Sequence, residues 1–148
     1  MHGIFREPEL SPENVLPNER ITRFVLYHGH FKKETGRVRP EAYTPSRKLK
    51  DISVYRTHRT SETDIWSIGE AYVSSLRKDR KPVLARADLS AATITGVGLS
   101  VVPHPYPHPR HANVTGWPDD QSERKMKAVE LANAATLVAH PDRHDVIH

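Results

Sequence analysis

The sequence predicts an α+β fold: a small, mostly antiparallel sheet packed by two main helices, with a flexible N-terminal arm. Short β-branched and aromatic runs come before and between the helical patterns. Apolar residues recur at helical spacing at about 61–78 and 120–138. The 148 residues include no cysteine, and a chain of this length can form its core by packing alone. We therefore expect an extended arm over 1–19, a single α+β domain over 20–139 and a frayed tail over 140–148.

The first third of the chain predicts an arm, two strands and a long loop. Residues 1–19 contain three prolines and four glutamates with little apolar periodicity, which is typical of an extended arm. Residues 21–31 are rich in β-branched and aromatic side chains and predict a strand. Residues 32–50 are polar and basic and predict a loop, whereas the clean alternation of 51–59 predicts a second strand.

The first main helix has a recognisable start and one apolar face. Ser61 and Asp64 form a pattern similar to a capping box. The helix should end before Pro82, because proline lacks the N–H that a helix interior needs. The apolar face consists of Ile65, Ile68, Tyr72, Val73 and Leu76.

The second half of the chain predicts two short strands and two helices. We expect strands at 83–87 and 99–102, with a short helix at 88–94 between them. Asp88 or Ser90 caps that helix, and Gly96 or Gly98 ends it. The start of the last helix is marked by the capping candidates Asp119, Asp120 and Ser122.

The positive charge of the chain is concentrated in one block. The net charge is +4, but residues 20–60 hold eleven Lys/Arg against three Asp/Glu, which is +8 for that stretch. Such a block predicts a polyanionic partner: a nucleic acid, a nucleotide or an acidic protein surface. Ten histidines add groups that titrate near neutral pH.

Several classes of site and location are disfavoured by composition. The lack of cysteine excludes disulfides, thiolate metal sites and cysteine nucleophiles. No apolar run approaches the roughly 20 residues that a membrane span needs, so we expect no membrane partner. The N-terminal residues have no basic start followed by an apolar stretch, and we expect a cytoplasmic protein.

The two expected strands share a template in which two apolar residues precede two polar groups on one face. Alternation along a strand defines these faces. The polar groups lie at the C-terminal end of each expected strand. If they are to form one site, the strands must be parallel, or a third segment must reach one of these ends. The faces are Phe24, Leu26, His28 and His30 in the first strand, and Ile52, Val54, Arg56 and His58 in the second.

The third segment is HPYPHPRHANVTGWP, residues 104–118. Alternate prolines fix φ and push each preceding residue towards extended geometry, so we expect a stiff surface loop that is a poor member of a sheet. This loop would present His108, Arg110 and His111 to a pocket, with Trp117 anchored in the core.

These residue types fit phosphate chemistry. Phosphodiester cleavage without a metal needs a base, an acid and a cation. The candidate acids and bases are His28, His30, His58 and His111. The candidate phosphate-binding residues are Arg56, Arg59, Arg86, His108, Arg110, Lys32, Lys33, Arg37 and Arg39. We expect no metal and no cofactor, because no carboxylate lies beside the pair His28 and His30 or the pair His108 and His111 to orient an imidazole.

The function expected from these features is binding of RNA or a nucleotide in a His/Arg-lined site, with metal-independent phosphodiester cleavage as the activity those groups would support. One alternative is a non-enzymatic module that docks its basic face on an acidic partner. A second follows from Tyr27-His28-Gly29, which is similar to the opening motif of ADP-ribosyltransferases. That resemblance implies an ADP-ribosyltransferase-like or other nucleotide-processing enzyme.

Overall fold

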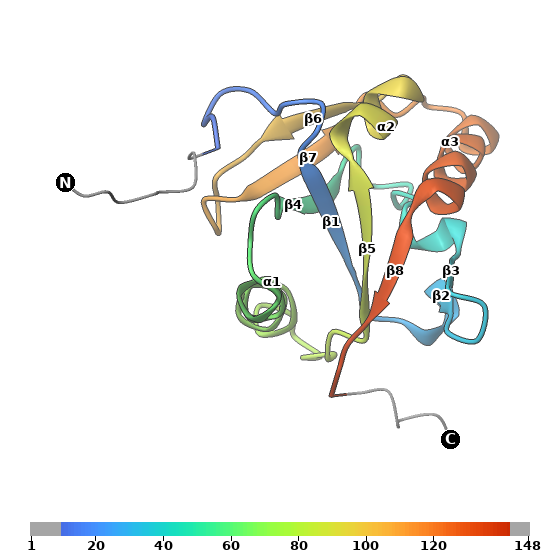
Figure 1. Cartoon of the computed structure of the whole chain (residues 1–148). Coiled ribbons are helices and arrows are strands. Elements are labelled where there is room, and N and C mark those ends of the chain that lie inside the picture. The colour runs from blue at the N-terminus through green and yellow to red at the C-terminus, as the bar shows by residue number, and fades with distance from the viewer. Residues whose placement is uncertain (1–9, 143–148) are drawn as a thin grey trace.

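The computed structural model describes residues 10–142 and confirms the α+β class, with a main antiparallel sheet in the order β6-β7-β4-β1-β5-β8 (Figure 1). Every neighbouring pair in this sheet is antiparallel. Its strands are β1 (Arg20–Val25), β4 (Ile52–Arg56), β5 (Ala85–Ser90), β6 (Ser100–Pro103), β7 (His111–Thr115) and β8 (Thr136–Ala139). A separate small hairpin pairs β2 (Phe31–Lys32) with β3 (Arg37–Val38).

Helices cover both faces of the main sheet. On one face α2 (Ala91–Gly96) and α3 (Gln121–Ala134) pack on a core cluster that includes Ile21, Val54 and Leu131. On the other face α1 (Glu62–Gly69) continues as a π-helical turn, Glu70–Ser74, and packs on a second cluster that includes Phe24, Tyr55 and Trp66. Figure 1 shows α1 and α3 on opposite sides of the sheet.

The helix starts agree with the capping signals in the sequence. The Ser61 hydroxyl accepts a hydrogen bond from the Asp64 N–H at 3.2 Å. Ser90 and Asp120 cap α2 and α3 in the same way. Gly98 has φ +85°, a conformation that glycine adopts without strain, just after α2 ends. Each cap satisfies an N–H that has no partner within its own helix.

Several expected boundaries are wrong. The first strand ends at Val25, and His28–His30 form a 3₁₀ turn, so these histidines do not continue a strand face. Pairing with β1 keeps β5 extended as far as Ser90, where a helix is expected from residue 88. The expected loop at 32–50 contains the β2–β3 hairpin and a buried tyrosine, Tyr43.

Two strands occur where the sequence predicts other structure. His111–Thr115 form β7, an internal strand, although 104–118 reads as a loop. None of the prolines of this segment falls within His111–Thr115, so every residue of β7 keeps its N–H for pairing. Thr136–Ala139 form β8 instead of the last turn of a helix, because they pair with the free edge of β5. Tertiary pairing thus overrides local helix propensity.

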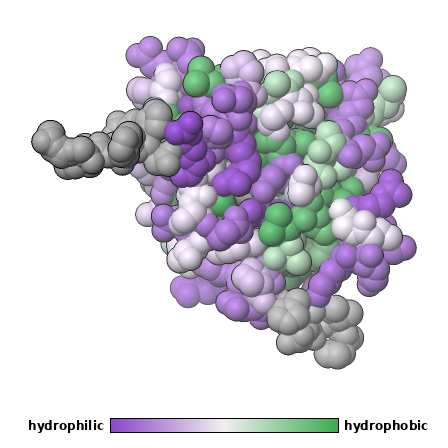
Figure 2. Space-filling view, viewed as in Figure 1, coloured by the Kyte–Doolittle hydropathy of each residue, from purple (hydrophilic) through white to green (hydrophobic). Residues whose placement is uncertain are grey.

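The edge position of β8 leaves part of the core uncovered. Figure 2 shows hydrophobic residues exposed over the β5–β8 part of the molecule, with hydrophilic residues around them. Leu137 packs on the first core cluster and Val138 on the second, and both are only partly buried.

Two side chains near the ends of the described chain are buried. Glu19 is 1% exposed and His140 is buried. Residues 1–9 of the expected arm and 143–148 of the expected tail lie outside the described residues. Within residues 10–142, no helix is both long enough and apolar enough to cross a membrane.

Candidate functional site

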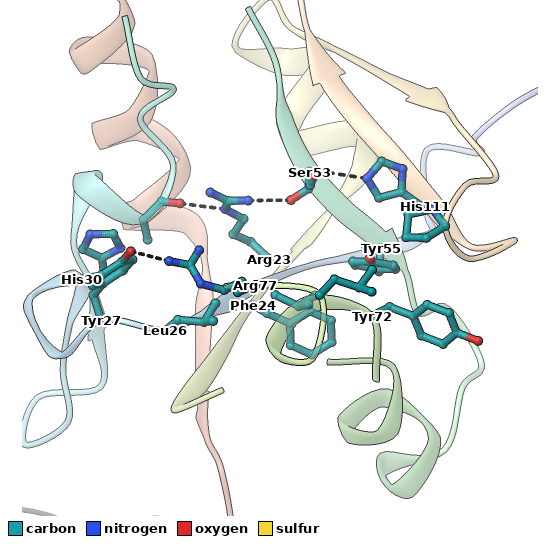
Figure 3. A pocket seen from close by; sticks show the side chains of 14 residues that line it. Arg23, Phe24, Leu26, Tyr27, His30, Ser53, Tyr55, Tyr72, Arg77 and His111 are labelled. Carbon is teal, nitrogen blue, oxygen red and sulfur yellow. Dashed lines mark hydrogen bonds between the residues drawn. The ribbon is translucent and has the colours of Figure 1, made fainter. Parts of the chain in front are cut away.

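A cavity of about 390 Å³ opens where β1 and β4 separate (Figure 3). The two strands pair only at Ile21–Arg56 and Thr22–Tyr55, while β1 continues alongside β5 as far as Val25. The resulting fork leaves a gap next to Arg23. One wall comes from the segment after β1, with Tyr27 and His30, and the other from β4, β7 and the turn after α1.

Arg23 spans the fork. Its Nε donates to the Ala42 carbonyl at 3.0 Å, and its Nη1 donates to the Ser53 carbonyl at 2.8 Å. Burial lowers the pKa of Arg23, but a guanidinium titrates so far above neutral pH that the side chain stays cationic. Within residues 10–142, no carboxylate forms an ion pair with it. Its charge is therefore uncompensated beside a cavity.

Aromatic rings line the cavity. Phe24 and Tyr55 pack edge to face at 5.6 Å between ring centroids, and Tyr72 lies at the opposite side of Tyr55 in Figure 3. Tyr55 is 3% exposed, and its hydroxyl makes no hydrogen bond to any described residue. Burial raises the pKa of Tyr55 to about 12, with a contribution from Tyr72. Tyr55 is thus a neutral donor without a protein acceptor.

His111 bridges two segments at the edge of the cavity. Its Nδ1 lies 2.8 Å from the His104 carbonyl oxygen, and its Nε2 lies 3.0 Å from the Ser53 Oγ. A carbonyl only accepts, so Nδ1 carries the proton and Nε2 accepts from the serine hydroxyl. Burial lowers the pKa of His111, so the ring is neutral at pH 7.

His30 and Arg77 complete the polar lining. Burial and the charge of Arg23 lower the pKa of His30, and Glu41 acts in the opposite direction. Arg77 donates to the Tyr27 hydroxyl at 2.8 Å and pairs with Asp79 at 2.9 Å. Because Arg77 already has a carboxylate partner, Arg23 is the stronger candidate for an anion site.

The structure brings together only two of the four histidines named as acids or bases. His30 and His111 line the cavity. His28 is exposed on the 3₁₀ turn, and His58 follows β4; neither is among the lining residues. The third segment does reach β4, but it does so as the paired strand β7, with His111 opposite Tyr55.

Arg56 and Arg86, expected to bind phosphate, are bound by carboxylates of the chain itself. Arg56 makes two contacts of 2.8 Å with Glu19. Arg86 holds Glu62 through two hydrogen bonds of 2.8 and 2.9 Å and contacts Asp88 at 3.1 Å. Both arginines are buried, and the charge of each is offset by a carboxylate of the chain itself.

All but one of the other expected phosphate-binding residues lie at two further hollows. Arg59, His108 and Arg110 line one of about 380 Å³, and Tyr72 lines both this hollow and the cavity. Lys32, Arg37 and Arg39 line another, of about 440 Å³, against α3. Lys33 lies in the turn between β2 and β3. The basic block of the sequence is thus not gathered at a single site.

Arg23, Ser53 and Tyr55 are missing from the residues that the sequence singles out. The sequence does contain a signal for Arg23, because this charged residue lies between Ile21 and Val25 on the same face of an expected strand. Ser53 left none, because its role depends on the register between β4 and β7. No group of three or more metal-ligating side chains that could hold an ion occurs within residues 10–142.

Comparisons of the chain with protein-family models, curated proteins and solved structures find no match. The chemistry of the site is therefore the ground for assigning function.

Proposed function

We propose that this protein binds a nucleotide, with the phosphate at Arg23 and the base against the aromatic wall of the cavity. One observation carries the proposal: Arg23 is a partly buried cation at a cavity, and no carboxylate of the described chain pairs with it. A shielded charge is costly unless an opposite charge offsets it, so the site favours an anion.

The buried arginines of the described residues differ in their partners and in their distance from a cavity. Arg56 and Arg86 each hold a carboxylate. Arg124 is buried, bonds to carbonyls of the loops around it and lines none of the hollows described above. Arg23 uses two of the five N–H donors of a guanidinium, which leaves three without an acceptor among residues 10–142. Phosphate oxygens match such donors in charge and geometry.

The rest of the cavity supports a ligand with a ring. Its volume lies within the range of small-molecule sites, and Phe24, Tyr55 and Tyr72 offer aromatic surface. The Tyr55 hydroxyl adds a second donor that has no acceptor in the described part of the chain. An anion alone would not need the aromatic wall, and a purely apolar ligand would leave Arg23 uncompensated.

Calorimetric titration with adenosine 5′-monophosphate, adenosine and inorganic phosphate at low salt tests this proposal. We expect the nucleotide to bind more tightly than either part. Arg23→Gln should weaken nucleotide binding about 10- to 100-fold, since a hydrogen bond to a charged group contributes about 1.5–3 kcal/mol. Arg47→Gln, which removes an exposed surface charge, is the matched control and should leave affinity unchanged. No saturable binding of the nucleotide, or equal affinity in Arg23→Gln, would contradict the proposal.

The end of an RNA strand is a second candidate ligand. Tyr72 lines both the cavity and the hollow that contains Arg110, so a strand that enters the cavity has a cation for its next phosphate. Titration with a trinucleotide under the same conditions distinguishes RNA from a mononucleotide as the ligand. Tighter binding than the mononucleotide, with a steeper salt dependence, supports RNA, while equal affinity supports a mononucleotide.

The two alternatives from the sequence receive less support. The groove of Lys32, Arg37 and Arg39 would serve a module that docks on an acidic protein, but it is distinct from the cavity. His28, which carries the resemblance to ADP-ribosyltransferases, is exposed and does not line the cavity.

A further inference from the structure

We propose that Ser53 and His111 are a nucleophile and its general base, and that they attack a phosphate ester held beside Arg23. The inference rests on the proposed function and extends it from binding to a reaction. It makes the protein a serine-dependent phosphoesterase that needs water as its only co-reactant.

The geometry of the pair is that of an activated nucleophile. The Ser53 Oγ lies 3.0 Å from the His111 Nε2, and the His104 carbonyl accepts from Nδ1 at 2.8 Å. The serine hydroxyl, the base and a group that orients the base are therefore all in hydrogen-bond contact. Because the carbonyl holds the proton on Nδ1, the lone pair of Nε2 faces the serine.

The sheet fixes the pair, and the two side chains differ in exposure. Ser53 lies opposite Asn113 and Tyr55 opposite His111, so Ser53 and His111 are diagonal neighbours on adjacent strands. Ser53 is exposed and lines the cavity, whereas His111 is 5% exposed. A ligand can thus reach the serine oxygen while the base stays shielded from bulk water.

The same serine residue binds the candidate phosphate cation. The Arg23 Nη1 donates to the Ser53 carbonyl at 2.8 Å, so a phosphate at Arg23 lies beside the nucleophile (Figure 3). The hydroxyl of Tyr55, two residues along β4, is a second donor in the same cavity. These two groups would bind the phosphate oxygens as negative charge builds on them.

The reaction balances with water. The Ser53 Oγ forms a bond to phosphorus, its proton passes to the His111 Nε2, and the bond from phosphorus to the ester oxygen breaks on the opposite side. The departing alkoxide takes a proton from solvent, and His111 releases its proton to solvent. A water molecule, deprotonated by His111, then attacks phosphorus; the Oγ–P bond breaks, and Ser53 regains the proton from His111. The products are the alcohol and the phosphate.

An alkyl fluorophosphonate tests the pair without requiring a nucleotide. Its reaction with an activated serine forms an Oγ–P bond and releases fluoride, and peptide mass spectrometry locates the adduct. We expect modification at Ser53 and none at this site in Ser53→Ala. Ser100→Ala is the matched control, because Ser100 is exposed on β6 of the same sheet, and it should react like the unaltered protein.

The role of the base is tested by His111→Asn, whose side-chain amide can still donate to the His104 carbonyl. Labelling of Ser53 should slow by at least about 100-fold, as expected for loss of general-base catalysis. If this variant fails to fold, the unaltered protein gives the comparison, since Ser53 should react at least about 100-fold faster than Ser100 in the same digest. Equal rates at Ser53 and Ser100, or undiminished labelling in folded His111→Asn, would overturn the pair.

The outcome is separable from that of the ligand titrations. Rapid labelling of Ser53 without nucleotide binding would support the nucleophile and would show that a nucleotide is not its substrate. Nucleotide binding without labelling of Ser53 would support the binding site and contradict the proposed reaction.

Discussion

The side chain of Trp117 closes the end of the proline-rich segment and contributes to the main core. It is 8% exposed, and its Nε1 donates to the Val114 carbonyl at 3.0 Å. The sequence predicts this anchoring role, and the burial agrees with it. The indole combines a large apolar area with one polar atom that has found a partner, which is how buried tryptophans are usually accommodated.

Trp117→Ala should lower the free energy of unfolding by about 3–5 kcal/mol, because it removes a large buried ring and leaves a cavity. Urea denaturation followed by circular dichroism measures the change. Tyr106→Ala is the control, since Tyr106 is 75% exposed on the same segment and should alter stability little. A loss below about 1 kcal/mol for Trp117→Ala would show that the indole does not hold this segment.

At the scale of elements, the close approach of α1 to the sheet positions one wall of the cavity. A Cβ placed on Gly69 would lie 2.8 Å from the Phe24 ring, so only glycine allows this helix to pack directly on β1. The chain then continues as a π-helical turn that carries Tyr72 to the cavity. The aromatic wall therefore depends on a residue that has no side chain of its own.

The segment before β1 is held by one ion pair. Arg56 binds the Glu19 carboxylate and also donates to the carbonyls of Ser11 and Asn14. Glu19 in turn accepts from the Leu16 N–H at 2.7 Å. This set of bonds explains why residues from Ser11 onwards are attached to the sheet, although their composition is typical of an extended arm.

Glu19→Gln should lower the free energy of unfolding by about 3–5 kcal/mol, because it leaves the buried Arg56 cation without its counter-charge. The residues before β1 should also become more accessible to protease. Glu13→Gln, at an exposed position of the same segment, is the control. Unchanged urea stability together with unchanged proteolysis in Glu19→Gln would mean that the ion pair contributes nothing to attachment.

At the scale of the whole molecule, the histidines make stability depend on pH in a specific window. Burial is the largest cause that lowers the pKa of His30, His108 and His111 below the ordinary value of 6.5. A lowered histidine pKa means that the unfolded chain binds protons first as the pH falls. The stability that these neutral rings contribute is therefore fully present above pH 6.5 and is lost as the pH falls through their lowered pKa values.

The free energy of unfolding should thus fall as the pH drops below about 6.5, before the paired carboxylates protonate. The hydrogen bond from Arg86 lowers the pKa of Glu62 below its ordinary value of 4.5, so loss of that pair begins only in stronger acid. Urea midpoints at pH 7.5, 6.5 and 5.5 measure the effect, and His30→Asn should make the decline shallower. Equal midpoints at all three pH values would contradict it.

Much of the local structure is determined by short-range features of the sequence. The hydroxyls of Ser61 and Ser90 and the carboxylate of Asp120 cap helices where the sequence places caps, because a cap satisfies N–H groups only three residues away. The burial of Trp117 and the α+β class also follow from patterns that are local or summed over the chain. His30 and His111 could be named as candidates because imidazole chemistry is a property of the residue.

Pairing between segments distant in the sequence determined two of the strands and the partners of the arginines. Thr136–Ala139 became β8, and His111–Thr115 became β7, because strand partners distant in sequence were available to them. Carboxylates from Glu19 and Glu62 neutralised two of the expected phosphate-binding arginines, whereas the separation of β1 from β4 left Arg23 without one. The sequence gives the sign and position of each charged residue. Whether an opposite charge compensates it depends on which groups the fold brings within a few ångströms, and no local sequence pattern contains that information.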